Sequence, residues 1–196
     1  DGIIKKQTGG VSSLIKANKG DQMFGTAKVT GPNTVEVTKP DGKVETYEAT
    51  KGIIVGTGAS VINIPGFTVD GKVVITAREA VSLKKVPGTL VLIGGGVIAL
   101  ELGMVYQKLG SKVIVVEMMD QLLPTEDPDV VKVVEKRFLA NGGEALVKAK
   151  AKSCTVKGNK AKVVVEHEGK ERTLDADVVL VAVGFKPNSK GLGLEE

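Results

Sequence analysis

A glycine-rich turn between an apolar run and a helical pattern restricts the fold of this chain more than any other feature. Residues 90–93 read Leu-Val-Leu-Ile, and they lead into a run of three glycines and then into the helical pattern of residues 96–109. Gly94, Gly96 and Ala99 fit the spacing G-x-G-x-x-A. The pattern predicts a strand, a sharp turn and a helix of a doubly wound α/β fold.

Each small residue of this turn has a physical role in binding phosphate. Gly94 lets the chain turn sharply out of the strand, and Gly96 lets backbone N–H groups approach a pyrophosphate closely. Ala99 keeps the helix near the strand. The helix N-terminus adds about half a positive charge and unpaired N–H donors, so it selects anions. The predicted contacts to a dinucleotide are Gly94, Gly95, Gly96, Val97, Ile98, Ala99, Leu100 and Glu101.

Glu117, at the end of the next predicted strand (residues 112–117), indicates which dinucleotide is bound. It lies 23 residues after Gly94, close to the ~20 expected for the acidic residue that holds the adenosine ribose. An enzyme for NADP would place a neutral residue here with arginines nearby, whereas two methionines and an aspartate follow Glu117. The glycines alone are also compatible with a tight turn that binds nothing. The strand, helix, second strand and acidic residue occur in the order that favours NAD binding.

The remaining sequence predicts strands on both sides of this unit. Before it, residues 23–29, 34–38 and 44–50 resemble strands of an antiparallel meander with a hairpin turn at 40–42, and residues 52–55 a fourth strand. A short helix is expected only after Gly10, because Gly9 and Gly10 interrupt the helical period. The stretch that follows the fourth strand, up to residue 69, is expected to be a surface loop.

After the unit, Asp127 and Pro128 predict the N-cap and first position of a second helix, with Val131, Val134 and Phe138 as its apolar stripe. Further strands are expected at residues 145–147, 153–156, 162–165 and 177–183. The fold class is therefore α/β: a Rossmann-type domain with a parallel sheet and a β-meander, preceded by part of another domain. The expected boundary lies near residues 76–87.

Composition excludes several classes of function. No apolar run approaches the roughly 18 residues of a membrane span. The net charge of +4 is scattered, and aromatic residues make up 3% with no Trp, which argues against nucleic-acid binding. A single cysteine excludes an internal disulfide framework and any CxxC redox or zinc pair, so no metal site is expected and the compartment is expected to be reducing.

Three segments carry a resemblance to a known family. SLKKVP (residues 82–87), VLIGGGVIALELG (91–103) and VYQKLGSKVIVVE (105–117) resemble the dihydrolipoyl dehydrogenases of the FAD- and NAD-linked disulfide reductases. The likeness covers almost the whole chain. It implies NAD and FAD as cofactors, and a parent enzyme that reoxidises dihydrolipoamide on the acyltransferase component of 2-oxoacid dehydrogenase complexes. It also implies a homodimer in the mitochondrial matrix or the bacterial cytoplasm, without nucleic acid or membrane as a partner.

The resemblance assigns further site residues. Gly56-Thr57-Gly58 is similar to the family's ATG motif, which implies FAD contacts for Ala27, Thr57, Gly58 and Ala59. The segment VGFKPN (residues 183–188) is similar to the family's VGRxPN, which implies a backbone contact of Gly184 near the nicotinamide. Phe185 replaces the arginine, which changes the local charge. Ala151 is expected to line the adenine pocket.

Glu101 has two interpretations. In the family, the matching glutamate forms an ion pair with a lysine on the helix that carries the redox cysteines, on the flavin side. That lysine is absent from this sequence. The alternative is a solvated helix residue, since a charge on the outer face of an amphipathic helix costs nothing. The resemblance favours the flavin-side role.

The family's catalytic residues are absent from these 196 residues. Neither the CxxxxC disulfide nor the His-Glu base pair is present, so no catalytic residue is assigned. Cys154 is expected to be a half-buried core residue of a strand, and His167 an exposed residue beside a turn at 168–170. We therefore expect an internal fragment: residues 1–78 from an FAD-binding domain, 79–184 an NAD-binding domain, and 185–196 the start of the return to the FAD domain.

Two other functions stay open. Glutathione, mercuric and trypanothione reductases share the architecture but normally take electrons from NADPH, and Glu117 speaks against them. A non-catalytic NAD-binding module is the other alternative, because every redox centre is missing. The mass of the purified chain bears on this second alternative: a value well above 20.4 kDa would indicate a longer protein.

Overall fold

The computed structural model describes residues 2–194, and its contacts divide the chain into two compact units. One unit contains the residues up to Gly58 and those from Asn188 onward, and the other is Ala59–Pro187. The second unit is longer at both ends than the expected residues 79–184. The assignment of the flanking residues to a flavin domain stays a prediction. Residues 1, 195 and 196, which belong to the expected terminal segments, lie outside the described residues.

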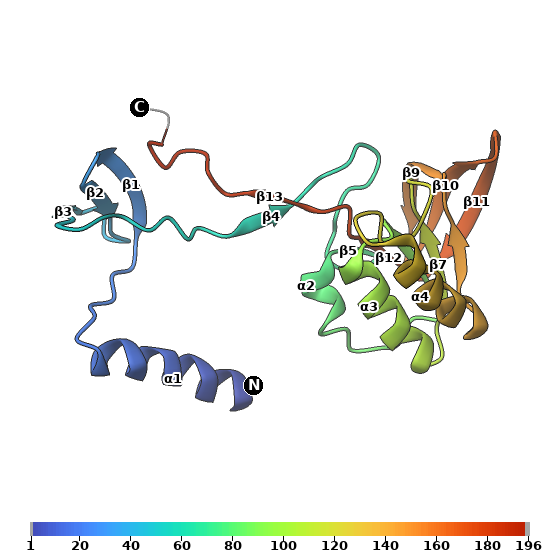
Figure 1. Cartoon of the computed structure of the whole chain (residues 1–196), viewed down its shortest axis with the longest axis horizontal. Coiled ribbons are helices and arrows are strands. Elements are labelled where there is room, and N and C mark those ends of the chain that lie inside the picture. The colour runs from blue at the N-terminus through green and yellow to red at the C-terminus, as the bar shows by residue number, and fades with distance from the viewer. Residues whose placement is uncertain (1, 195–196) are drawn as a thin grey trace. The chain divides into compact units, whose positions relative to one another are not determined.

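The first unit holds one helix and a small antiparallel sheet (Figure 1). Helix α1 (Gly2–Ala17) precedes β1 (Thr26–Gly31), β2 (Thr34–Thr38) and β3 (Val44–Glu48), which pair antiparallel in the order β1-β2-β3. The chain turns between β2 and β3 at Gly42, which has a φ of 84°. Its N–H donates to the Lys39 carbonyl over 2.9 Å. The predicted meander and its hairpin turn are confirmed.

Two predictions for this unit are wrong. Helix α1 is continuous through Gly9 and Gly10, whereas the sequence predicted a helix only after Gly10. A glycine inside a helix costs about 0.5–1 kcal/mol relative to alanine, which weakens a helix without ending it. Residues 52–55 form no strand. An apolar run becomes a strand only where another strand supplies backbone hydrogen-bond partners, and local sequence does not report this.

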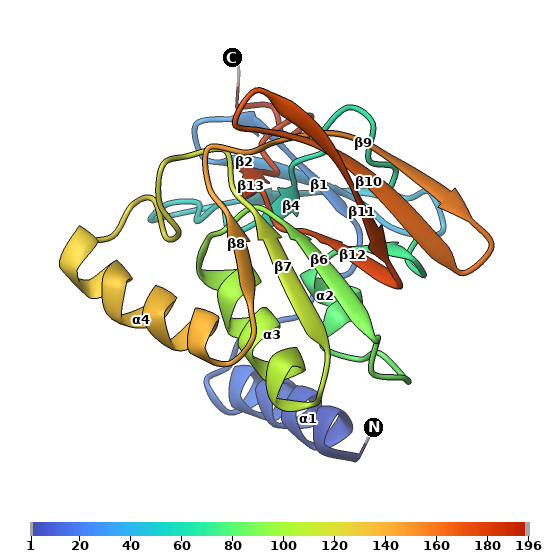
Figure 2. The same cartoon turned by 90° about the vertical axis from the view of Figure 1, so that its right-hand side faces the viewer.

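A five-stranded parallel sheet forms the centre of the second unit. Its order is β5-β12-β6-β7-β8, and every neighbouring pair is parallel. Figure 2 shows β12, β6, β7 and β8 side by side. The strands are β5 (Val74–Ile75), β6 (Thr89–Ile93), β7 (Lys112–Val116), β8 (Glu144–Leu146) and β12 (Val178–Val181).

The other elements of this unit cover the sheet or extend from it. Three helices lie in the crossovers and three strands form an antiparallel meander, in the order β11-β10-β9. A further short pair, β13 with β4, is antiparallel. Their bounds are α2 (Ala77–Ala80), α3 (Val97–Lys108), α4 (Pro128–Ala140), β4 (Ala59–Val61), β9 (Lys150–Lys157), β10 (Lys160–His167), β11 (Lys170–Ala176) and β13 (Phe185–Pro187).

Alternation along the parallel strands creates two cores. Leu90 and Leu92 of β6 pack with the residues of α2, α3 and α4, whereas Val91 and Ile93 pack with the meander. All four side chains are at most 3% exposed. Strands that are buried on both faces appear in the sequence as continuous apolar runs. The unit therefore has three layers: helices, parallel sheet and antiparallel meander (Figure 2).

Local signals locate helix α4 correctly. The Asp127 carboxylate accepts the N–H of Asp129 over 2.8 Å, and Pro128 occupies the first turn of α4. Val131 and Phe138 of the predicted stripe are buried, at 2% and 0% exposure. Val134 is partly buried against the same core. The predicted cap and stripe are confirmed.

Some predictions for the meander and the loop before it are wrong. Strand β11 was not predicted, because only Leu174 and Ala176 of its seven residues are buried and the others are polar or exposed. The loop that follows β4 is not simply a surface loop, since Phe67 is 4% exposed and belongs to the core on the meander side. The carbonyl of Gly66 accepts the N–H of Cys154 over 2.8 Å. This loop is therefore a wall of the second unit.

Cys154 and His167 lie on the meander. Cys154 of β9 is half-buried, as predicted. Burial and the negative charge of Asp70 raise the pKa of its thiol. His167 is half-buried rather than exposed, and it lies at the end of β10, where it pairs with Lys170 across the hairpin turn. Among residues 2–194, no helix combines the length and the apolar character that crossing a membrane requires.

Asp177 connects the meander to the parallel sheet. Its carboxylate accepts the backbone N–H of Thr89 over 2.9 Å and forms an ion pair with Lys160 over 3.3 Å. The N–H of Thr89 and the Lys160 ammonium hold the pKa of Asp177 below its ordinary value. Its stabilisation is therefore present above the unfolded aspartate pKa of about 3.9, and it is lost as the pH falls through the lowered pKa of the folded state.

We expect Asp177→Asn to lower the free energy of unfolding by about 1 kcal/mol at neutral pH, after allowance for solvent screening. The difference from the wild type should shrink as the pH falls from about 5 to about 2. Urea unfolding followed by circular dichroism at several pH values measures this. Asp175→Asn is the matched control, because the Asp175 carboxylate accepts a hydrogen bond from the exposed Lys162 ammonium and not from a backbone N–H of the parallel sheet. A difference for Asp177→Asn that does not depend on pH would contradict the assignment.

Candidate functional site

The glycine-rich turn leaves the parallel sheet at the carboxyl end of β6. Gly94 has a φ of 98°, a backbone conformation that residues with a side chain rarely adopt. An added Cβ would also lie 2.6 Å from the carbonyl oxygen of Ala182. Glycine is therefore required at position 94 by both conformation and space. At Gly96, in contrast, an added Cβ would meet no atom within 4 Å. The turn is packed where it leaves the strand and open where the helix begins.

Helix α3 begins at this open position. Gly96 is its N-cap and has no side chain, so no side-chain oxygen accepts the first N–H groups of the helix. Such groups attract anions, together with the helix dipole. Ala99 is fully buried against the sheet, and an added Cβ on Gly103 would lie 2.7 Å from Leu92. Close packing on β6 thus fixes the direction in which the N-terminus of α3 points.

Glu117 is a buried acidic residue that directly follows β7, and it is only 7% exposed. One carboxylate oxygen accepts the N–H of Gly95 over 2.6 Å, and the other accepts the N–H of Met119 over 2.8 Å. The two backbone donors satisfy the negative charge without a basic side chain. An ionised carboxylate has about four acceptor positions, so about two stay available for other donors. Glu117 therefore joins the glycine turn to the end of β7 and keeps acceptor capacity.

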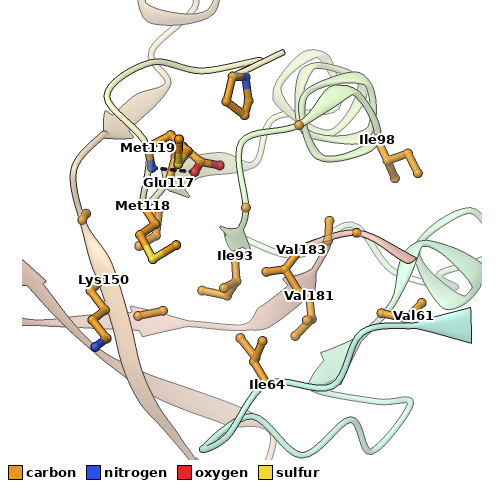
Figure 3. Close-up of a pocket in the computed structure, with 18 of the residues that line it drawn as sticks. Val61, Ile64, Ile93, Ile98, Glu117, Met118, Met119, Lys150, Val181 and Val183 are labelled. Atoms are coloured by element: carbon orange, nitrogen blue, oxygen red, sulfur yellow. Dashed lines mark hydrogen bonds between the residues drawn. The ribbon is translucent and has the colours of Figure 1, made fainter. Parts of the chain in front are cut away.

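A pocket of about 910 Å³ lies at this edge of the sheet, in the second unit. Figure 3 shows Glu117, Met118 and Lys150 on one side of it and Val61 and Val183 on the opposite side. The sequence runs from β6 through α3 to β7, whereas β12 lies on the other side of β6. The strand order therefore reverses at β6. In α/β folds, nucleotides bind at this kind of reversal, outside the carboxyl ends of the strands.

The pocket brings together many of the predicted nucleotide contacts. Seven of them line it: Gly94, Gly96, Val97, Ile98, Glu117, Ala151 and Gly184. Three others lie behind it. Gly95 donates its N–H to Glu117, and Ala99 and Leu100 are buried in the core on the helical side.

Glu101 is exposed on α3 and forms no ion pair with any residue among 2–194. Neither of its two interpretations is thereby tested.

Sequence reasoning missed the apolar walls of the pocket. Val61, Ile64 and Pro65 come from β4 and the loop after it, which was predicted to be a surface loop. Met118 and Met119 were used only as an argument against NADP. No local signal identifies these residues, because the chain between β4 and β5 reaches the pocket through long-range contacts with β9. The lining residues that were not predicted as contacts are Val61, Ile64, Pro65, Ala77, Ile93, Val116, Met118, Met119, Leu123, Pro124, Thr125, Ala149, Lys150, Lys152, Val181, Ala182, Val183 and Phe185.

Two lysines also line the pocket. Lys152 forms an ion pair with Glu166. The hydrogen bond between them raises the pKa of Lys152 and lowers the pKa of Glu166. Its charge is therefore balanced. Lys150 is exposed at the pocket rim beside Met118 (Figure 3). Of these two lysines, Lys150 is the one that forms no ion pair with a residue in the described part of the chain.

The residues predicted to contact FAD lie outside this pocket. Ala27, Thr57, Gly58 and Ala59 are all exposed. The hydroxyl of Thr57 donates to the carbonyl of Asn188 over 2.8 Å, and the N–H of Asn188 donates to the carbonyl of Gly58 over 3.0 Å. The two predicted motifs, GTG and VGFKPN, therefore meet in space although they are 131 residues apart.

These features define a Rossmann-type nucleotide-binding fold. The family model of the pyridine nucleotide-disulphide oxidoreductases matches residues 2–196, so the chain belongs to that family. This membership implies NAD and FAD as cofactors. The α/β fold and the resemblance predicted from sequence are confirmed.

The relatives indicate the branch of the family. The chain is 42% identical to the mitochondrial dihydrolipoyl dehydrogenase of Dictyostelium discoideum, over 100% of the chain and 41% of that protein. It is 40% identical to the mitochondrial dihydrolipoyl dehydrogenase of Caenorhabditis elegans, over 97% of the chain and 39% of that protein. The crystal structure of LpdA from Mycobacterium tuberculosis is similar with a TM-score of 0.86 and 30% identity, over 98% of the chain and 42% of LpdA. The chain thus spans about two fifths of these relatives.

We expect Glu117→Gln to lower the free energy of unfolding by about 1–3 kcal/mol, the range for a buried polar group that loses a partner. A glutamine has one acceptor atom, so its NH₂ group would face the N–H of either Gly95 or Met119. Urea unfolding measures the difference. Asp120→Asn is the control, since Asp120 follows in the same segment and is exposed. Equal stability of Glu117→Gln and the wild type would show that the hydrogen bonds from Gly95 and Met119 to Glu117 contribute nothing to the free energy of unfolding.

Proposed function

We propose that this chain is the NAD-binding portion of a flavin-dependent dihydrolipoyl dehydrogenase. The parent enzyme would reoxidise dihydrolipoamide of 2-oxoacid dehydrogenase complexes, with NAD as the final electron acceptor. The observation that carries the proposal is the pocket at the reversal of strand order, with the buried Glu117 bonded to the phosphate-binding turn. The likeness of almost the whole chain to about two fifths of dihydrolipoyl dehydrogenases supports the choice within the family.

In this proposal, the N-terminus of α3 binds the pyrophosphate of NAD. The first N–H groups of the helix have no side-chain cap, and Gly96 leaves open space in front of them. Two phosphates can therefore approach the backbone closely and are attracted by the helix dipole. The packed side of the turn at Gly94 keeps these donors in place before the ligand arrives.

Glu117 would hold the adenosine ribose. Each of its oxygens already accepts one backbone N–H, so about one acceptor position on each is available for a ribose hydroxyl. The same carboxylate bonds the N–H of Gly95, so the ribose and the pyrophosphate would be positioned by one hydrogen-bonded unit. Ala151 and the methionines would then lie near the adenine, and Gly184 near the nicotinamide. When bound there, NAD would supply a hydride-accepting nicotinamide ring beside Gly184.

The charges of the pocket favour NAD over NADP. A 2′-phosphate would lie beside the buried carboxylate of Glu117, which forms no ion pair with a basic side chain among residues 2–194. Lys152 is balanced by Glu166. The second candidate is an NADPH-dependent disulfide reductase, because Lys150 lines the pocket. A lysine can bind a phosphate as a point charge, so it could hold the 2′-phosphate of NADPH.

The assignments beyond the NAD pocket rest on the relatives. Thr57, Gly58, Ala59 and the backbone of Ala27 would contact FAD, and Glu101 would face the flavin side. The lipoyl substrate, the homodimer and a location in the mitochondrial matrix or bacterial cytoplasm are carried over in the same way. The redox cysteines of the family are absent from this sequence, so these residues alone would bind NAD without completing the reaction.

We expect the chain to bind NADH at least roughly tenfold more tightly than NADPH, a difference of about 1.4 kcal/mol. Glu117→Ala should weaken NADH binding by about 1–3 kcal/mol and reduce the preference. Isothermal titration calorimetry with both nucleotides measures this. Lys150→Ala is the companion variant, because it should weaken NADPH binding if Lys150 holds a 2′-phosphate. Tighter binding of NADPH by the wild type would favour the NADPH-dependent disulfide reductases.

We expect Gly96→Ser to weaken NADH binding more than tenfold while the chain stays folded. A serine fits because an added Cβ meets no atom within 4 Å, and serine is a favourable N-cap residue. Its hydroxyl would bond the N–H groups that the pyrophosphate needs. Gly52→Ser, at another glycine with no atom within 4 Å, is the matched control for folding and binding. Unchanged NADH affinity in Gly96→Ser would exclude the turn as the phosphate site.

A further inference from the structure

Two of the four methionines of the chain lie next to each other at the pocket. Met118 is 67% exposed and Met119 is 48% exposed, although both side chains are apolar. They directly follow Glu117, on the same side of the pocket as the buried carboxylate (Figure 3). The other two methionines lie elsewhere: Met104 packs against the helical core and Met23 belongs to the first unit.

The backbone at these methionines is held firmly. The N–H of Met119 donates to Glu117 over 2.8 Å, and its carbonyl accepts the N–H of Lys148 over 2.7 Å. The segment that carries the two thioethers is therefore held beside Glu117 at the pocket, while the side chains are open to solvent. A group in this position meets small oxidants from water and also meets whatever occupies the pocket.

We propose that Met118 and Met119 are an oxidation site that controls nucleotide affinity, in which conversion of their thioethers to sulfoxides weakens dinucleotide binding. The inference rests on the proposed function of the pocket. The oxidant is a peroxide: each sulfur takes one oxygen atom from hydrogen peroxide, the O–O bond breaks, and water is released. The sulfur is oxidised by two electrons and the peroxide is reduced by two.

The physical reason for the loss of affinity is the polarity of the product. A sulfoxide is a strong hydrogen-bond acceptor, whereas the thioether packs as an apolar and adaptable group. When a nucleotide covers Met118 and Met119, a sulfoxide there loses its water and faces the apolar walls of the pocket. The change is reversible, because methionine sulfoxide reductases restore the thioether. The site would thereby couple NAD binding to the local peroxide concentration.

Cys154 is the competing oxidisable group of the chain. It is half-buried on β9, and burial raises the pKa of its thiol, so little reactive thiolate is present at neutral pH. Disulfide and sulfenic acid products of a cysteine are reversed by dithiothreitol, whereas methionine sulfoxide is not. A dithiothreitol step after oxidation therefore separates the two chemistries.

The test compares NADH binding by the full chain before and after treatment with hydrogen peroxide and then dithiothreitol. Isothermal titration calorimetry gives the dissociation constant, and mass spectrometry of tryptic peptides gives the extent of oxidation. Met118 and Met119 share the peptide 113–132, whereas Met23 and Met104 lie in peptides 20–28 and 86–108. We expect the dissociation constant to rise at least about fivefold after oxidation. Saturating NAD should slow the oxidation of peptide 113–132 and leave that of Met23 unchanged.

Two double variants make the result specific. In Met118→Leu with Met119→Leu, the dissociation constant after peroxide should equal that variant's own starting value. In Met23→Leu with Met104→Leu, the fivefold rise should persist. Loss of affinity in the first variant, or full oxidation of peptide 113–132 without any change in affinity, would overturn the inference. Absence of NADH binding before peroxide would overturn the proposed function, whereas binding that oxidation leaves unchanged overturns only the oxidation site.

Discussion

The hydrogen bond between the Glu117 carboxylate and the N–H of Gly95 is the contact on which the site depends. A buried carboxylate is unfavourable unless donors surround it, and here two backbone N–H groups supply them. The close approach requires a glycine, because a Cβ on Gly95 would lie 2.9 Å from Leu122 and 3.2 Å from the carboxylate. One bond thus explains the acidic residue, the middle glycine and the fixed position of the turn.

The position of this bond follows from the parallel sheet. The carboxyl ends of β6 and β7 lie next to each other, since Ile93 pairs with Val116. Both faces of these strands are covered, one by helices and the other by the meander, so their side chains are apolar. Where the strands end, the turn lines the pocket through Gly94 and Gly96. Polar groups needed for recognition can therefore gather at this edge without weakening either core.

The pocket combines a rigid polar element with adaptable apolar walls. The turn, α3 and Glu117 are held by backbone bonds and close packing, so their geometry does not depend on a ligand. The apolar walls come from Ile64 and Pro65 in the loop after β4 and, on the side of Glu117, from the two methionines that follow it. The polar element determines what can bind and in which orientation, whereas the apolar walls contribute affinity through contact area. One site thus combines a turn held in fixed geometry with walls of apolar side chains.

The sequence by itself determined the elements whose causes are local. The glycine spacing, the helix cap at Asp127 and the hairpin at Gly42 depend on residues a few positions apart, and the position of Glu117 follows from its place at the end of the next strand of the same strand-helix-strand unit. The structure confirms each as a structural feature. The tertiary structure alone decided that the loop around Phe67 is a buried wall, that β11 is a strand, and that Thr57 meets Asn188. It also decided that the methionines after Glu117 line the pocket rather than merely follow a strand. These features depend on partners that are distant in the sequence, and neither periodicity nor propensity carries information about which distant segment provides the partner.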